Sequence, residues 1–397
     1  MTLFKQKITW IGFVGVFVVL IVFGAAMMGS VLGMKPQHLP VALVVADQPA
    51  QTAKGKAVAV GEMIKQMLLA NEQMPFTFTV IETEAAAREA LDEGKYYGAL
   101  VLPADLSANV SSLMSAQPVQ ASVSMISNDG LNTQAATVVK QGLGQAMRMV
   151  NAELARSMLS QIGSQTEQLS IAVAQALLSP IQVQEEAVHA VGANNASGNA
   201  PGLLTQIMWM GSLIAAVILF LARGNARKAG ANSWASILAQ LGTGVIMIGA
   251  ASGFLIWMAS SWYGMELAHA SETWLFLWLA GSMYFLIQSA LLNWIGFPAM
   301  AIMVLLMFFS MPILNAAPEF LTQTTRDWIY SWTPLRFVAD GLREVMYFSG
   351  LKAAASNAAI VWSIGGAFLL LLLASGFKKG KASVEASRAS AVPAPIN

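Results

Sequence analysis

The chain has 397 residues, of which 56% are hydrophobic and 11% are charged, and its mean hydropathy is +0.59. An ordinary soluble domain has about 25% charged residues, so the excess apolar surface here predicts an integral membrane protein. A net charge of +1 argues against nucleic acid as a partner. The absence of cysteine excludes disulfides and thiolate metal sites. Three widely spaced histidines offer little to a metal, so we expect no metal site.

Six stretches without charged residues are long enough to cross a membrane, which takes about 20 apolar residues in a helix. They lie between Lys7 and Lys35, at about Leu203–Ala222, between Lys228 and Glu266, twice within Thr273–Pro318, and at Ala353–Phe377. The Gly and Pro of Asn293–Pro298 divide Thr273–Pro318 into two spans joined by a tight turn. The expected fold is therefore a membrane all-α bundle of six transmembrane helices.

Basic residues gather at three places that an even number of spans would put on one side of the membrane. They are Lys5 with Lys7, Arg223 with Arg227 and Lys228, and Lys378 with Lys379 and Lys381. Cytoplasmic loops retain positive charge, so we expect this side, with both termini, in the cytoplasm.

Residues 35–200 form a water-soluble α/β domain, with a helical hairpin, that is inserted between spans one and two. The segment holds 14 acidic and nine basic residues, and its strand-like and helix-like patterns alternate. Strands are expected at Pro40–Ala46, Phe76–Ile81, Tyr97–Leu102 and Val119–Ile126; helices are expected at Ala57–Asn71, Ala85–Leu91, Ala104–Met114, Leu131–Ile162 and Glu167–Leu178. The run Val191–Gly202 is typical of a flexible linker.

The expected domain organisation has four parts. Residues 1–34 hold the cytoplasmic N-terminus and first span, residues 35–200 the external domain and linker, residues 201–377 spans two to six, and residues 378–397 a disordered cytoplasmic tail.

Between spans five and six, charged and aromatic residues are mixed, which is typical of amphipathic helices at a membrane surface. Pro334, Arg336 and Arg343 are the candidate residues of this outer hairpin. The two arginines would lie on one helical face and could attract lipid phosphates. Ion pairs with Asp340 and Glu344 explain them equally well.

Two further candidate sites lie in the membrane half. The loop Arg223–Ser233 is a candidate ATPase-docking surface through Arg223, Arg227 and Lys228, although positive-inside anchoring explains the same charges. Gln206, Gln240 and Gln288 form a candidate polar seam, and ordinary interhelical hydrogen bonding is the alternative. The small residues of Gly249–Gly253 could pack against a second copy or within the chain.

Several stretches resemble those of the phage-infection-protein (YhgE/Pip) family, which is itself similar to type-2 ABC permeases. They are LPVALVVADQPA (Leu39–Ala50), GKYYGALVLPADLSANV (Gly94–Val110), ISNDGLNTQAA (Ile126–Ala136) and WTPLRFVADGLREVMYFSG (Trp332–Gly350). This resemblance implies a bacterial cell membrane, a homodimer and a separate ATP-binding subunit. The chain departs from many relatives in its short helical external part and in having only seven residues before the first span.

The sequence lacks the phosphate-binding motif G-x-x-x-x-G-K-[ST] and any recognisable catalytic constellation, so we predict no catalytic or cofactor-binding residue in this chain. ATP would bind a partner subunit. The leading hypothesis is the permease subunit of an ABC-type exporter that moves an amphiphilic or lipid-like substrate. The alternative is a surface assembly or receptor protein whose external domain binds a partner.

Overall fold

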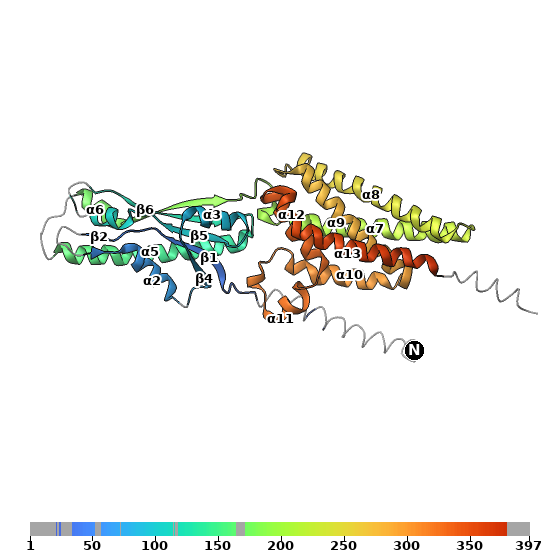
Figure 1. The fold of residues 1–397 in the computed structure, drawn as a ribbon, viewed down its shortest axis with the longest axis horizontal. Coiled ribbons are helices and arrows are strands. Elements are labelled where there is room, and N and C mark those ends of the chain that lie inside the picture. Colours follow the sequence, from blue (N-terminus) through green and yellow to red (C-terminus); the bar gives the residue numbers. More distant parts are fainter. Residues whose placement is uncertain are drawn as a thin grey trace, which may run out of the picture.

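The computed structural model describes residues 34–51, 57–71, 73–113, 115, 118–163 and 171–378, together with Ile21 and Gly24. An α/β domain and a helical bundle lie end to end along the long axis (Figure 1). The expected first span and the expected tail after Lys378 fall outside the described residues, apart from Ile21, Gly24 and Met34.

The domain contains a five-stranded sheet with strand order β4-β1-β5-β6-β7. Its strands are β1 (Leu39–Val45), β4 (Phe76–Ile81), β5 (Gly98–Leu102), β6 (Ala121–Asn128) and β7 (Ile181–Val188). β1 runs parallel to β4 and β5, β6 is antiparallel to β5, and β7 is parallel to β6. Every residue of the central strand β5 is buried, as its unbroken apolar sequence requires. A separate ribbon joins β2 (Ala50–Gln51) to β3 (Ala57–Val58).

Helices cover both faces of this sheet. α2 (Val60–Leu69), α4 (Leu106–Ser112) and α5 (Thr133–Gly163) pack on one face, and α3 (Glu84–Asp92) packs on the other. A single carboxylate organises two helix starts, because Asp47 accepts hydrogen bonds from the backbone N–H groups of Gly61 (2.7 Å) and Ser107 (2.7 Å). α6 (Ile171–Leu178) follows and packs near the far end of α5.

Among the described residues, the helical bundle contains four helices long and apolar enough to cross a membrane. They are α7 (Ala200–Lys228), α8 (Ser233–Ser261), α9 (Ala270–Ile295) and α13 (Ala355–Ala374), which continues as a 3₁₀ turn to Phe377. α9 is the central helix and buries most of its length against α7, α8 and α13.

The expected fifth span differs from the other four in length. α10 (Ala299–Ser310) has 12 residues, or roughly 18 Å of helix, and the short turn η3 (Met311–Ile313) follows it. Pro312 accounts for this ending, since a proline ring clashes with the preceding turn of an α-helix. α10 with η3 is thus shorter than a typical span, yet it leads back to the end of the bundle where η5 and α12 lie.

Beyond α10 the chain forms short turns and then a longer helix beneath the domain. These elements are η4 (Pro318–Phe320), α11 (Gln323–Thr325), η5 (Arg326–Tyr330), α12 (Pro334–Tyr347) and η6 (Gly350–Lys352). α12 packs against α7, α9 and α13 and buries its apolar side. Gly341 allows this contact, because a Cβ there would lie 2.2 Å from the Phe276 ring of α9.

Two expectations about packing are decided by local contacts. The segment expected as a linker is held in place: Asn195 is buried, and its Nδ2 donates to the carbonyl oxygen of Glu266 (2.8 Å). The small residues of α8 pack within the chain, because a Cβ on Gly249 would meet the Trp278 ring of α9 at 2.7 Å.

Candidate functional site

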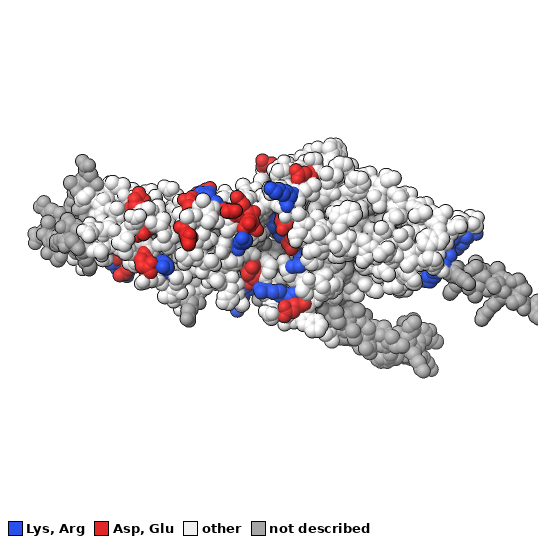
Figure 2. Space-filling view, viewed as in Figure 1, with Lys and Arg blue, Asp and Glu red and all other residues white. Residues whose placement is uncertain are grey.

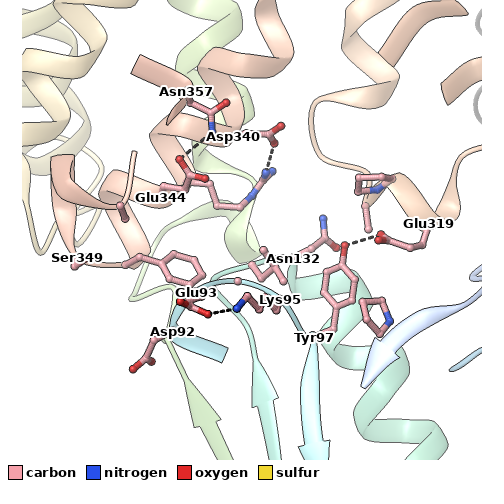
Figure 3. Close-up of a pocket in the computed structure, with 18 of the residues that line it drawn as sticks. Asp92, Glu93, Lys95, Tyr97, Asn132, Glu319, Asp340, Glu344, Ser349 and Asn357 are labelled. Atoms are coloured by element: carbon pink, nitrogen blue, oxygen red, sulfur yellow. Dashed lines mark hydrogen bonds and ion pairs between the residues drawn. The ribbon is translucent and has the colours of Figure 1, made fainter. Parts of the chain in front are cut away.

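A cavity of about 530 Å³ lies where the α/β domain meets the helical bundle. The domain contributes the turn between α3 and β5, and the bundle contributes η4, α12 and the start of α13 (Figure 3). Charged side chains of both signs line it: Asp92, Glu93, Lys95, Glu319, Asp340, Arg343, Glu344 and Lys352. Figure 2 shows that charged residues gather on the domain and around this junction, while the flank of the bundle is almost free of them.

Arg343 is the candidate residue from the outer hairpin that lines this cavity. Its guanidinium donates to Asp340 Oδ1 (2.7 Å) and to the carbonyl oxygen of Leu314 (3.1 Å). The Arg343 side chain is only 11% exposed, so this ion pair is largely removed from water. Of the two alternatives for Arg343, a lipid phosphate or an ion pair, the contact with Asp340 is the ion pair.

The cavity also joins the two parts of the chain directly. The Tyr97 hydroxyl, at the start of β5, donates to Glu319 of η4 (2.6 Å). Asn132, just before α5, donates to the carbonyl oxygen of Asn315 (3.0 Å). These bonds connect residues about 180 or more positions apart in sequence, which fixes the domain on the bundle.

Glu344, like Glu319, lines this cavity without an ion pair to a basic side chain among the described residues. It accepts one hydrogen bond, from Asn357 Nδ2 of α13 (2.9 Å). Burial raises the pKa of Glu344, the charge of Asp340 raises it further, and the bond from Asn357 and the charge of Arg343 act in the opposite direction. Glu344 consequently holds a proton more strongly than an exposed glutamate.

The other two residues of the outer hairpin have positions outside the cavity. Pro334 is the first residue of α12, where its fixed φ suits a helix start. The Arg336 guanidinium lies 4.2 Å from the centres of the Tyr330 and Phe337 rings, in cation–π contact with both. Arg336 and Arg343 thus have different partners.

At the opposite end of the bundle, the three candidate docking residues lie on the last turns of α7. Arg227 Nη2 donates to the carbonyl oxygen of Lys378 (3.4 Å), and Lys228 ends the helix. Arg223 faces inward and is only 7% exposed. We call Arg223, Arg227, Lys228 and Lys378 the basic end.

The three glutamines of the candidate seam are separated in the bundle. Gln288 of α9 is fully buried and donates to the carbonyl oxygen of Trp209 in α7 (3.1 Å). Gln240 of α8 accepts from Asn293 of α9 (3.2 Å), whereas Gln206 is half-buried on α7. Interhelical bonding within the chain thus accounts for part of their chemistry. Within the described part of the chain, the buried Trp209 Nε1, Tyr284 hydroxyl, Gln288 Oε1 and Ser289 hydroxyl have no hydrogen-bond partner.

Sequence reasoning missed several cavity residues. Tyr97 was predicted as the first residue of the strand Tyr97–Leu102; it is buried, and its hydroxyl reaches Glu319. Asn132 carried no separate signal, because its partner Asn315 is distant in sequence. Glu344 was named only as an ion-pair partner of the two arginines, and its printed hydrogen bond is instead to Asn357. The one available hint was the group of polar residues after β6, in a stretch that also carried the family resemblance.

The sequence matches the family model described as ABC-2 family transporter protein over residues 7–375. The chain belongs to the ABC-2 family of transporter proteins. Searches of curated proteins and of solved structures found no match. Family membership makes the chain a membrane subunit for transport that is not itself catalytic, and it implies a separate ATP-binding subunit.

Proposed function

We propose that this ABC-2 protein is the permease subunit of a homodimeric exporter in a bacterial cell membrane, close to the YhgE/Pip proteins. An ATPase supplied by a separate subunit drives it from the cytoplasm, where both termini lie. The substrate is amphiphilic: its polar group passes the cavity at the domain junction while its apolar part follows the bundle.

The observation that carries the proposal is the opposite charge character of the two ends of the bundle. Acidic residues are missing between Glu186 and Glu266 and between Glu272 and Glu319, and only Glu385 follows Glu344. The basic end therefore has cations without acidic neighbours, which favours the cytoplasmic side. It also provides a surface for an acidic partner, because Lys228 is exposed and Arg227 is half-exposed.

The polar cavity supports the substrate class. A cavity with carboxylates, a guanidinium and amides beside an apolar bundle suits a molecule with both polar and apolar parts. The unpartnered polar atoms near Trp209 and Gln288 would give such a molecule hydrogen-bonding groups inside the bundle.

Charge reversal at Arg227 and Lys228 tests the coupling. The full chain is affinity-purified from its native membranes, and vanadate-sensitive ATP hydrolysis is measured in the eluate. We expect Arg227→Glu with Lys228→Glu to insert normally and to lower this activity at least about tenfold, as loss of two interface ion pairs predicts.

The matched control reverses two cations of the domain, Lys65→Glu with Lys140→Glu, which should leave the activity unchanged. If the wild-type eluate contains no vanadate-sensitive hydrolysis, the exporter proposal is wrong. If the double variant at the basic end retains full activity, docking through these two residues is wrong.

A further inference from the structure

Arg223 is a buried cation, and part of its guanidinium has no partner among the described residues. It continues the face of α7 that buries Met208, Ser212 and Ala216, so it turns toward the neighbouring helices. Its Nε and Nη2 atoms are buried and have no hydrogen-bond partner among the residues that the structure describes. A buried charge without a partner is costly, so we expect an anion to neutralise Arg223 when the protein is in its membrane.

The chain has almost no means of supplying that anion itself. No acidic residue occurs in α7, in α8 or in the connection between them, and the last acidic residue of the sequence is Glu385. The nearest charged residues add more positive charge: Arg227 contacts the carbonyl oxygen of Lys378, and Lys378 Nζ donates to the carbonyl oxygen of Trp294 (2.9 Å). Apart from Glu385, the missing anion must come from another molecule.

Apolar rings lie beside Arg223 at this end of the bundle. Phe220, one turn earlier on α7, packs edge-on against Phe297 of the α9–α10 turn (5.7 Å between ring centres). Phe297 is about half exposed, and so are Ile218 and Leu221 on the opposite side of α7. Exposed apolar side chains at the end of a candidate membrane span lie against lipid tails.

We propose that Arg223 binds the phosphate of an anionic phospholipid in the leaflet at the basic end, with the acyl chains over Phe220 and Phe297. The position fits, since Arg223 directly follows the apolar run that ends at Ala222, where hydrocarbon gives way to headgroups. A guanidinium offers phosphate two parallel N–H donors, which a lysine cannot do. Arg227 and Lys228, one turn further on, reach beyond this level toward water.

The purified full chain in delipidated detergent provides the test. Its thermal midpoint is followed by tryptophan fluorescence during titration with dioleoyl phosphatidylglycerol or dioleoyl phosphatidylcholine, and retained lipid is counted by native mass spectrometry. We expect phosphatidylglycerol to raise the midpoint of the wild type. Arg223→Gln should weaken its apparent affinity at least about tenfold, because charge-assisted hydrogen bonds are lost. Arg223→Lys should give an intermediate result, and the exposed control Lys228→Gln should match the wild type.

The direction in which Arg223→Gln changes the thermal midpoint distinguishes loss of lipid binding from a folding defect. Without anionic lipid, Arg223→Gln should be more stable than the wild type, since it removes an unpaired buried charge. With phosphatidylglycerol the order should reverse. Failure of the order to reverse, or equal stabilisation by phosphatidylcholine, would overturn the proposal.

Two further results would assign the anion to another source. Equal stabilisation by inorganic phosphate alone would show a free anion in place of a lipid. Loss of stability in Glu385→Gln without added lipid would show the chain's own tail as the partner. The assay contains no ATPase, so its failure leaves the proposed coupling to ATP hydrolysis untouched.

Discussion

The two ends of the helical bundle differ in how their buried arginines are neutralised. Arg343, at the domain end, has a carboxylate at 2.7 Å and a backbone carbonyl at 3.1 Å. Arg223, at the basic end, is buried to a similar degree, yet two of its guanidinium nitrogens have no partner among the described residues. Figure 2 shows the same contrast, with both signs of charge around the junction and blue alone at the far end.

This difference indicates that the two ends are completed in different ways. The domain end contains the partners of its own buried cation, so it is a finished structural unit that can hold a cavity open. The basic end lacks acidic residues and needs a molecule from outside the chain, which is where we propose that lipid and the ATPase bind. Variants that remove single partners separate these two situations.

Removing the partner of Arg343 should have the largest effect on stability. Asp340→Ala leaves a guanidinium that is 11% exposed with no carboxylate, which should cost about 2–4 kcal/mol. We expect a correspondingly lower midpoint in thermal unfolding of the full chain. The double variant Asp340→Ala with Arg343→Met should recover at least half of this loss, because the unpaired charge is gone.

Asp327→Ala is the matched control for that variant. Asp327 is exposed, and its carboxylate accepts a hydrogen bond from the nearby Gln323 (3.0 Å), so its removal should change stability by less than about 0.5 kcal/mol. Equal losses in Asp340→Ala and Asp327→Ala would show that the Arg343 pair does not stabilise the domain end.

A glycine contact beneath the cavity should give the next largest effect. Gly341→Ala places a Cβ within 2.2 Å of the Phe276 ring, so α12 must shift from α9, at a cost of about 1–3 kcal/mol. Gly366→Ala in α13 is the control, because a Cβ there meets nothing within 4 Å. The control should be neutral or gain up to about 1 kcal/mol, as alanine is the better helix former. Thermal unfolding of both variants measures the difference, and a neutral Gly341→Ala would contradict the close packing of α12.

Most local elements of the domain could be predicted from sequence because they depend on near neighbours. The strand Phe76–Ile81 was predicted with its observed bounds, and the helix at Glu84–Asp92 differs from the prediction by one residue at each end. β7 was missed, since its sequence is largely polar and five of its eight residues are exposed at the sheet edge. Its pairing with β6 involves residues 60 positions away, which no local pattern reveals.

In the membrane half, composition predicts where the long helices lie but not how long each one is or which residues contact one another. Apolar runs predicted the four long helices, but they could not show that Pro312 follows a helix of only 12 residues. Arg343 was identified as a candidate because of its spacing from Arg336, yet the two have different partners. Partners such as Glu319 for Tyr97 lie in segments brought together only by folding, so the cavity could not be read from the sequence.

The smallest effect should come from protonation of Glu344 in the cavity. Burial raises its pKa above the usual value of 4.5, so the folded chain holds this proton more tightly than the unfolded chain does. Its contribution to stability is full below the usual value and is lost as the pH rises through the raised pKa. Glu344→Gln keeps a neutral group and an acceptor for Asn357, so its midpoint should rise relative to the wild type between about pH 4 and about pH 8. Glu186→Gln is the control of opposite sign. Arg88 lowers the pKa of the Glu186 carboxyl, so this variant should be less stable than the wild type above about pH 4.5, and the difference should shrink as the pH falls below that value. Parallel pH profiles for the wild type and Glu344→Gln would mean that Glu344 is as well solvated in the folded chain as in the unfolded one, and that the cavity is open to water.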